Sequence, residues 1–113
     1  MGLISSLKKT FNKPYKTVSV AEAKDLLSSG AALIDVRSVQ EWRSGRASQA
    51  KHIPLDRLHT STAGINKNRA VIAMCQSGVR SASAAKLLAA QGYDAYSLRG
   101  GMSAWRSAGE PVR

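Results

Sequence analysis

The sequence predicts a single α/β domain with a mainly parallel central sheet and helices on both of its faces. Short apolar runs typical of strands alternate with segments that have the composition and end signals of helices, and this alternation is typical of parallel sheets. The run over 70–74 is continuously apolar, as expected of a strand covered on both faces. The length of 113 residues suits one domain, and 43% hydrophobic residues suffice for a compact core.

Residues 1–14 are expected to form a basic amphipathic arm that precedes a domain over 15–113. Its apolar residues fall on one helical face with two lysines beside them: Leu3, Ile4, Leu7, Phe11, Lys8 and Lys9. They are too few for the core of a signal peptide. Three alternatives stay open for the arm: packing on its own domain, binding to a membrane surface or partner, and myristoylation, whose formal pattern Met1-Gly2 with Ser6 matches.

The first half of the domain is expected to contain two strands and three short helices. Two capping boxes, in which a serine is followed three residues later by a glutamate, mark the starts of the first two helices: Ser19 with Glu22, and Ser38 with Glu41. The predicted order is an edge strand over 18–20, a helix over 21–27, a central strand over 32–36, a short helix that carries Trp42, a loop over 45–49, a short helix over 56–60 and a loop over 62–68.

The second half is expected to contain two strands and two helices. The strand over 70–74 leads through a turn into a helix over 81–91, which is rich in strong helix formers and ends at Gly92. A strand over 95–98 follows, and Gly100 and Gly101 turn the chain into a last helix that bears Met102 and Trp105.

The stretch from Cys75 to Ser81 is the strand-to-helix turn and holds the only cysteine of the chain. Backbone amides and the positive end of the helix dipole converge at such a turn, and Gly78 allows the backbone to curl so that these amides point inward. Arg80 adds a full positive charge. These features lower the pKa of a thiol, so Cys75 is predicted to be a nucleophilic thiolate rather than an inert core residue.

The pattern Cys75-x-x-Gly78-x-Arg80-Ser81 resembles the active-site loop of the single-domain rhodanese family, the thiol-dependent sulfurtransferases. Three further stretches resemble the family signatures in the expected order: 33–37 with Glu41 and Trp42, then 45–55, then 98–102 with Trp105, Gly109 and 111–112. Two departures are visible. Residues 46–49 lack the usual His-Ile-Pro-Gly, and Gln76 stands where many members have arginine, which removes one positive charge from the pocket mouth.

The resemblance implies a rhodanese-like fold and a sulfurtransferase that carries sulfane sulfur on a Cys75 persulfide. The donor would be thiosulfate or a persulfide, and the acceptor cyanide, a thiol or an acceptor protein. Residues implied to bind the substrate are Gln76, Ser77, Gly78, Val79, Arg80 and Ser81. In parallel sheets the ends of strands meet at one crevice, so Asp35, Arg37, Gly100 and Gly101 are expected to support the site.

Several roles are expected from the residues in this context. The loop amides would cradle the persulfide, and Arg80 would either hold donor oxygens or brace the loop. Asp35 and Arg37 are expected to act through ion pairs and loop hydrogen bonds. Because a preformed thiolate needs no base, neither His52 nor His59 is assigned a catalytic role, and no cofactor or metal is expected.

Two alternatives remain beside sulfur transfer with turnover. One is a persulfide carrier in a sulfur relay. The other is a phosphatase or arsenate reductase, but these use Cys-x5-Arg, whereas here the arginine comes one residue earlier and Ser81 takes its place. A shorter loop is a tighter cradle, suited to one sulfur atom.

The charge of the chain predicts anionic partners. It has 17 Lys and Arg against 7 Asp and Glu, a formal net charge of +10, which would steer anionic donors to the pocket or favour an acidic acceptor protein. No aromatic stacking motif accompanies the charge, so nucleic-acid binding is not expected. One cysteine allows no intrachain disulfide, and no apolar run has the length of a membrane span. A reducing cytoplasm is therefore the expected location.

Overall fold

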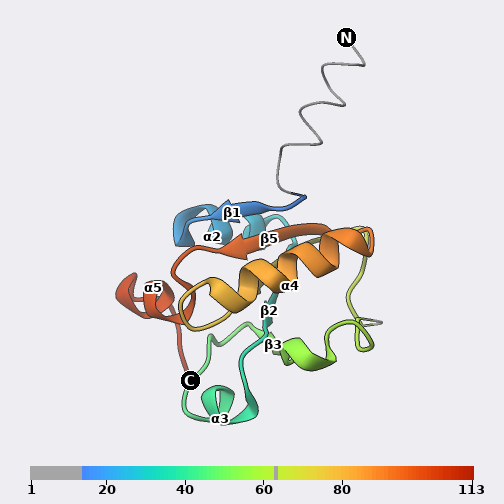
Figure 1. The fold of residues 1–113 in the computed structure, drawn as a ribbon. Helices are drawn as coiled ribbons and strands as arrows, with labels where there is room; N and C mark the ends of the chain where they lie inside the picture. Colours follow the sequence, from blue (N-terminus) through green and yellow to red (C-terminus); the bar gives the residue numbers. More distant parts are fainter. Residues whose placement is uncertain (1–13, 63) are drawn as a thin grey trace.

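The computed structural model describes residues 14–62 and 64–113 (Figure 1), so the expectations for the N-terminal arm lie outside the described residues. The elements in chain order are β1 (Lys16–Val18), α2 (Val20–Ser28), β2 (Ala32–Asp35), α3 (Val39–Arg43), β3 (Lys51–His52), the 3-10 helix η1 (Leu55–Arg57), β4 (Ala70–Met74), α4 (Val79–Ala90), β5 (Asp94–Leu98) and α5 (Gly101–Ser107). This order alternates strands and helices, as the sequence predicts.

The strands of the described residues form one five-stranded sheet in the order β1-β5-β4-β2-β3. Every neighbouring pair is parallel, which confirms the predicted α/β class with a parallel sheet. In this register Asp35 lies beside both Met74 and His52, and Ala73 lies beside Ser97. Strands β2, β4 and β5 therefore end at the same edge of the sheet, and Cys75 follows the central one.

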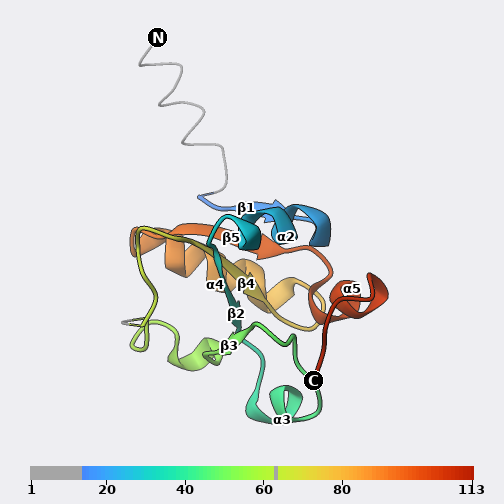
Figure 2. The same cartoon turned by 180° about the vertical axis from the view of Figure 1, so that it is seen from behind.

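Helices cover both faces of the sheet. Helix α4 packs on one face through Ala84, Ala85 and Leu88, whereas α2 and α5 pack on the other through residues such as Ala23 and Trp105. Figure 1 shows α4 in front of the strands, and Figure 2 shows it behind them. Each face thus has its own apolar core, and β4 is buried between the two, in agreement with its continuous apolar run.

Several boundaries differ from the sequence predictions by one or more residues, and three of the differences have a local cause. Strand β1 ends at Val18 instead of reaching Val20, because Ser19 caps α2: its hydroxyl accepts a hydrogen bond from the Glu22 amide at 3.1 Å. Helix α4 begins at Val79, two residues before the predicted start, since Gly78 takes a left-handed conformation with φ of 114° as its N-cap. The helix predicted over 56–60 is the 3-10 turn η1, which follows Pro54.

Strand β3 was absent from the sequence prediction. It has two residues, Lys51 and His52, and neither belongs to an apolar or alternating run. It is defined only by its pairing with β2, which no local pattern reveals. Among the described residues, no helix combines the length and apolar character that crossing a membrane requires.

Candidate active site

Cys75 lies at the point where β4 ends and the turn into α4 begins. It is 1% exposed, and its sulfur is the acceptor of two backbone hydrogen bonds. The Gly78 amide lies 3.1 Å and the Ser81 amide 3.3 Å from Cys75 Sγ. The amides can take these positions because the positive φ of Gly78 bends the chain around the sulfur.

This environment lowers the pKa of the Cys75 thiol below its ordinary value. Burial by itself raises the pKa, because it disfavours the thiolate. Hydrogen bonding outweighs this effect: the Ser81 hydroxyl and the amides of Ser81, Gly78 and Ser77 all stabilise the negative sulfur. At a given pH, a larger fraction of Cys75 is therefore in the thiolate form than for an ordinary buried cysteine.

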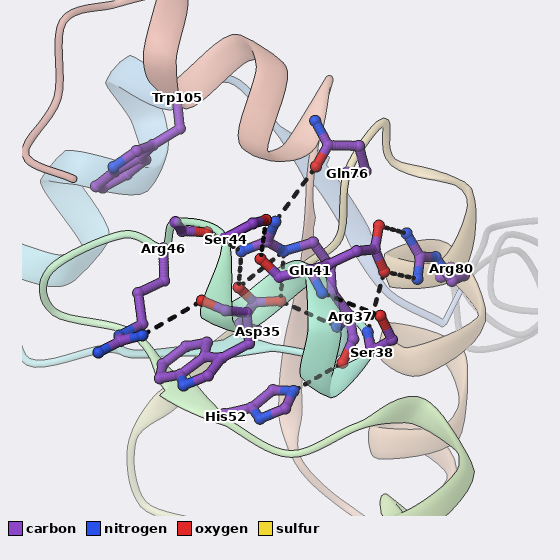
Figure 3. A network of polar contacts seen from close by, with 12 residues as sticks. Asp35, Arg37, Ser38, Glu41, Ser44, Arg46, His52, Gln76, Arg80 and Trp105 are labelled. Atoms are coloured by element: carbon purple, nitrogen blue, oxygen red, sulfur yellow. Dashed lines mark hydrogen bonds and ion pairs between the residues drawn. The ribbon is translucent and has the colours of Figure 1, made fainter. Parts of the chain in front are cut away.

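Arg80 leaves the turn toward α3, where it forms a two-point ion pair with Glu41 (Figure 3). Its Nη1 lies 2.6 Å from Glu41 Oε1, and its Nη2 lies 2.8 Å from Oε2. Hydrogen bonds from Arg80 lower the pKa of Glu41 to about 2. Of the two roles that the sequence left open for Arg80, this geometry supports bracing of the loop.

Glu41 was expected from the sequence in a capping box and in a family signature, but not in the site. The local sequence explains Glu41 as the partner of Ser38 in a capping box, and both hydrogen bonds of that box are present. The pairing of Glu41 with Arg80 joins residues 39 positions apart, so no local pattern could have revealed it.

Asp35 and Arg37 form a buried ion pair directly after β2. Arg37 Nη2 donates to Asp35 Oδ2 at 2.8 Å and to the Gly45 carbonyl at 2.7 Å, and Nε donates to both Asp35 oxygens. Asp35 is fully buried and Arg37 is 2% exposed. The pair thus fixes the chain after β2 to the following loop, and the Arg37 charge is not part of a basic surface.

Gln76 connects this pair to α5. Its Oε1 accepts a hydrogen bond from Arg37 Nη1 at 3.3 Å (Figure 3). Its Nε2 donates to Ser103 Oγ at 3.2 Å. An arginine at this position, as in the family pattern, would place a second guanidinium beside Arg37. The glutamine instead holds the turn through a neutral bridge.

The start of α5 supports the active-site turn through its backbone. The Met102 amide donates to the Cys75 carbonyl at 2.7 Å, and the Ser103 amide donates to the Gln76 carbonyl at 3.2 Å. Gly101 has φ of 51°, and a Cβ there would collide with the Cys75 carbonyl oxygen. Gly100 and Gly101, which the sequence placed near the site, are thus at the contact between α5 and the turn.

His52 serves as a packing and hydrogen-bonding residue in this structure. Its Nε2 lies 2.7 Å from the Arg37 carbonyl oxygen. Its ring stacks on Trp42 with centroids 4.7 Å apart and 7° between the planes, and Arg46 lies over the same indole at 4.8 Å. His59 is an exposed residue after η1, and Trp105 lies fully buried in the core.

A groove of about 590 Å³ lies beside the turn, between the end of β2 and η1. Its walls include apolar side chains and three arginines: Val36, Val39, Pro54, Leu55, Arg37, Arg57 and Arg80. Of these wall residues, only Arg37 and Arg80 were predicted from the sequence to belong to the site. The walls of the groove come from segments that meet only when β2, β3 and β4 have assembled.

Together, the parallel sheet and the amide-lined cysteine at the end of its central strand define a class of α/β domains with a thiol nucleophile. The family model described as Rhodanese-like domain matches residues 19–108. The chain belongs to the rhodanese-like domain family.

Individual proteins of known sequence or structure agree with this assignment. The chain is 35% identical over 94 residues to the thiosulfate sulfurtransferase GlpE of Ectopseudomonas mendocina, covering 82% of this chain and 86% of that protein. A rhodanese-like domain protein from Staphylococcus aureus is 36% identical, with a TM-score of 0.73 and coverage of 80% of this chain and 90% of that one. A rhodanese-related protein from Thermoplasma volcanium shares the fold with a TM-score of 0.79 at 24% identity, over 88% of this chain and 98% of that one.

Proposed function

We propose that this protein is a thiosulfate sulfurtransferase of the rhodanese type, which moves sulfane sulfur through a persulfide on Cys75. The observation that carries the proposal is the pair of amides, from Gly78 and Ser81, directed at a buried cysteine sulfur. Such donors stabilise an anionic sulfur without a base. The family membership and the name of the Ectopseudomonas relative support the same reaction.

The first half-reaction charges the cysteine with sulfur. The Cys75 thiolate attacks the outer sulfur of thiosulfate and forms a sulfur–sulfur bond. The bond between that outer sulfur and the sulfite group breaks, and sulfite leaves with the electron pair. No proton has to move, because the nucleophile is already the thiolate.

The second half-reaction returns the enzyme to its starting state. A thiophilic acceptor such as cyanide or a thiolate attacks the outer sulfur of the persulfide, and the electron pair of the broken bond returns to Cys75. The amides that hold the thiolate are placed to hold the persulfide as well. In this proposal Ser77 and Gly78 contribute through the backbone, and Ser81 contributes through its backbone and its hydroxyl. Arg80 keeps the turn in shape through Glu41.

The rival classes are less well supported by the site. A phosphatase needs an arginine that is free to hold phosphate oxygens, but here Arg80 is engaged by both Glu41 oxygens. A persulfide carrier in a relay would use the same Cys75 chemistry with an acceptor protein as partner, and the charge of +10 favours an acidic one. A reducing compartment such as the cytoplasm suits either case, because the thiol must stay reduced.

The test is the intact mass of the reduced protein before and after thiosulfate, followed by cyanide. We expect a mass gain of one sulfur atom in the wild type, its loss with cyanide, and no gain in Cys75→Ser. Circular dichroism of the variant checks that its fold is kept. Sulfur on the Cys75→Ser variant, or none on the wild type with either thiosulfate or an organic persulfide, would contradict the proposal.

A further inference from the structure

We propose that the groove beside the Cys75 turn binds the apolar stem of an organic thiol, which is the sulfur acceptor of the enzyme. This inference rests on the proposed function and names the class of acceptor for the second half-reaction. It follows from three properties of the groove: its connection to Cys75, its exposed apolar side chains and its balanced charges.

Backbone hydrogen bonds of the sheet join a wall residue of the groove to the strand that ends just before Cys75. The Val36 amide donates to the Met74 carbonyl at 2.9 Å, so a wall residue of the groove pairs with the residue that precedes Cys75. The Leu55 amide in turn donates to the Val36 carbonyl at 3.1 Å. Val36 and Cys75 belong to the same apolar core cluster, against which Leu55 packs. A stem in the groove would therefore lie close to the sulfur that reacts.

Exposed apolar side chains mark this side of the molecule. Within residues 14–62 and 64–113, the large hydrophobic side chains that are exposed are Val39, at 47%, and Val79, at 75%. Val39 lines the groove, and Val79 belongs to the active-site turn itself. Scattered exposed valines need no explanation, but one that lines the groove and one on the turn that supplies Arg80 to the same groove are typical of a binding surface.

The charges around the groove favour an uncharged occupant. The guanidinium of Arg37 is paired with Asp35, and that of Arg80 is paired with Glu41 (Figure 3). The remaining charged wall residues, Asp56 and Arg57, are neighbours of opposite sign. The groove thus offers little net charge to hold an inorganic dianion. Its volume of about 590 Å³ also exceeds what a small anion fills and falls in the range of about 300–1,000 Å³ that organic ligands occupy.

The step assigned to this acceptor is balanced. After the persulfide has taken one proton from water, the sulfur of the thiolate R–S⁻ forms a bond to the outer sulfur of Cys75–S–SH. The bond between that outer sulfur and Cys75 Sγ breaks, and its electron pair restores the Cys75 thiolate. The proton stays on the transferred sulfur, and the product is the organic persulfide R–S–SH. No further oxidant or reductant is needed.

The experiment uses a homologous series of uncharged thiols: 2-mercaptoethanol, 3-mercaptopropanol, 4-mercaptobutanol and 6-mercaptohexanol. The full chain is first converted to the Cys75 persulfide with thiosulfate and then separated from the thiosulfate. Intact mass then measures how fast each thiol removes the added sulfur atom. Cyanide serves as the acceptor that has no stem. We expect the second-order rate constant for sulfur transfer, expressed per thiolate, to rise with the length of the alkyl chain of the thiol. The rise should be at most about fourfold per methylene, which is the effect of burying one such group at about 0.8 kcal/mol.

Two valines provide a matched pair of variants. Val39 and Val20 are each the first residue of a helix that is preceded by a serine N-cap in a Ser-x-x-Glu capping box. Val39 lines the groove, whereas Val20 packs against the core on the other face of the sheet. Threonine replaces one methyl group with a hydroxyl at nearly constant shape. We therefore expect Val39→Thr to flatten the dependence on chain length and Val20→Thr to leave it unchanged, and Val39→Ile to steepen it.

The outcomes separate this inference from the proposed function. Failure of cyanide to discharge the charged protein would contradict the proposed function itself. Normal discharge by cyanide, with rate constants that are independent of chain length, would overturn the groove as the acceptor site. A chain-length dependence that Val39→Thr and Val20→Thr reduce equally would overturn the assignment as well, because the effect would not come from the groove. Thermal unfolding of each variant checks that the fold is kept.

Discussion

At the scale of single residues, the site combines a buried sulfur with donors that are fixed before any substrate arrives. Burial raises the pKa of the Cys75 thiol, whereas hydrogen bonds from the amides of Gly78 and Ser81 lower it. Ser81 contributes twice, through its amide and its hydroxyl. The Ser81 Oγ lies 3.1 Å from the Gly78 carbonyl oxygen and 2.9 Å from Ser97 Oγ, so its single proton stabilises the thiolate when it turns from the Gly78 carbonyl to the sulfur.

Replacing Ser81 with alanine should therefore raise the pKa of the Cys75 thiol. Because the folded-state pKa is lowered in the wild type, the thiolate persists to lower pH, and this advantage is lost in the variant. At pH values below the pKa of the thiol, we expect iodoacetamide to alkylate Cys75 about tenfold more slowly in the variant than in the wild type. This is the effect of losing about 1.5 kcal/mol from a hydrogen bond to a charged group. At alkaline pH the two rates should converge, since both sulfurs are then ionised.

Ser83→Ala is the control for this measurement, because Ser83 is an exposed residue on the same helix. Its pH profile should overlay that of the wild type. An unshifted profile in Ser81→Ala would show that the hydroxyl does not stabilise the thiolate, and the backbone amides would then carry the whole effect.

At the scale of elements, α5 and the active-site turn form one unit. Two amides at the start of α5 donate to the carbonyls of Cys75 and Gln76, and this contact requires a close approach of the two backbones at Gly101. The turn is thus held from the outside by α5 and, through Arg80 and Glu41, by α3. Its inward-facing amides stay free for the sulfur.

Gly101→Ala tests whether this contact shapes the turn. Gly101 and Gly109 both have positive φ, of 51° and 74°, so alanine at either position carries the left-handed strain of about 1–2 kcal/mol. An alanine Cβ at position 101 would collide with the Cys75 carbonyl oxygen, whereas a Cβ at position 109 would have no such neighbour within 4 Å. We expect Gly109→Ala to lower the free energy of unfolding by about 1 kcal/mol and to keep the rate of persulfide formation.

Gly101→Ala should lower the unfolding free energy by more, about 3 kcal/mol or above, and slow persulfide formation, because the turn has to move. Urea denaturation and the rate of sulfur uptake from thiosulfate measure the two effects. Equal losses in both variants would mean that strain at the glycine, and not the contact with the turn, accounts for the result.

How far the sequence predicts these elements depends on whether the signal is local. The capping boxes at Ser19 and Ser38, the apolar run of β4 and the turn at Cys75 are all encoded within a few residues, and the structure contains each of them. Strand β3 and the Glu41–Arg80 pair depend on contacts between distant segments, and a single sequence contains no signal for them. The groove is missed for the same reason.

At the scale of the whole molecule, the excess of positive charge sets how the fold responds to acid. The 17 Lys and Arg are opposed by 7 Asp and Glu, and protonation of these carboxylates removes the compensation. Self-repulsion then destabilises the compact state. A carboxylate that stays ionised to low pH is consequently important for acid stability. The division into an arm over 1–14 and a domain over 15–113 stays a prediction in this picture.

Glu41→Gln should lower the stability of the protein at neutral pH and make that stability less dependent on pH in acid. The pKa of Glu41 is lowered from 4.5 to about 2 by its partner Arg80, so the pair stabilises the fold fully above the unfolded-state pKa and loses its effect as pH falls from about 4.5 to about 2. Because the side chains are 32% and 38% exposed, we expect a loss of about 1 kcal/mol at most in the unfolding free energy of Glu41→Gln at neutral pH. The difference from the wild type should shrink through that window and vanish near its lower end.

Glu22→Gln is the matched control, since Glu22 occupies the same position in the capping box of α2 and has no arginine in an ion pair with it among the described residues. Glutamine keeps the capping hydrogen bond in both variants, so the larger loss in Glu41→Gln isolates the contact with Arg80. Urea unfolding at a series of pH values makes the comparison. If Glu41→Gln and Glu22→Gln lost the same free energy at neutral pH, the brace between α3 and the active-site turn would contribute nothing to stability. Arg80 would then be free to act on the substrate, and the role of the guanidinium would shift from the scaffold to the sulfur donor.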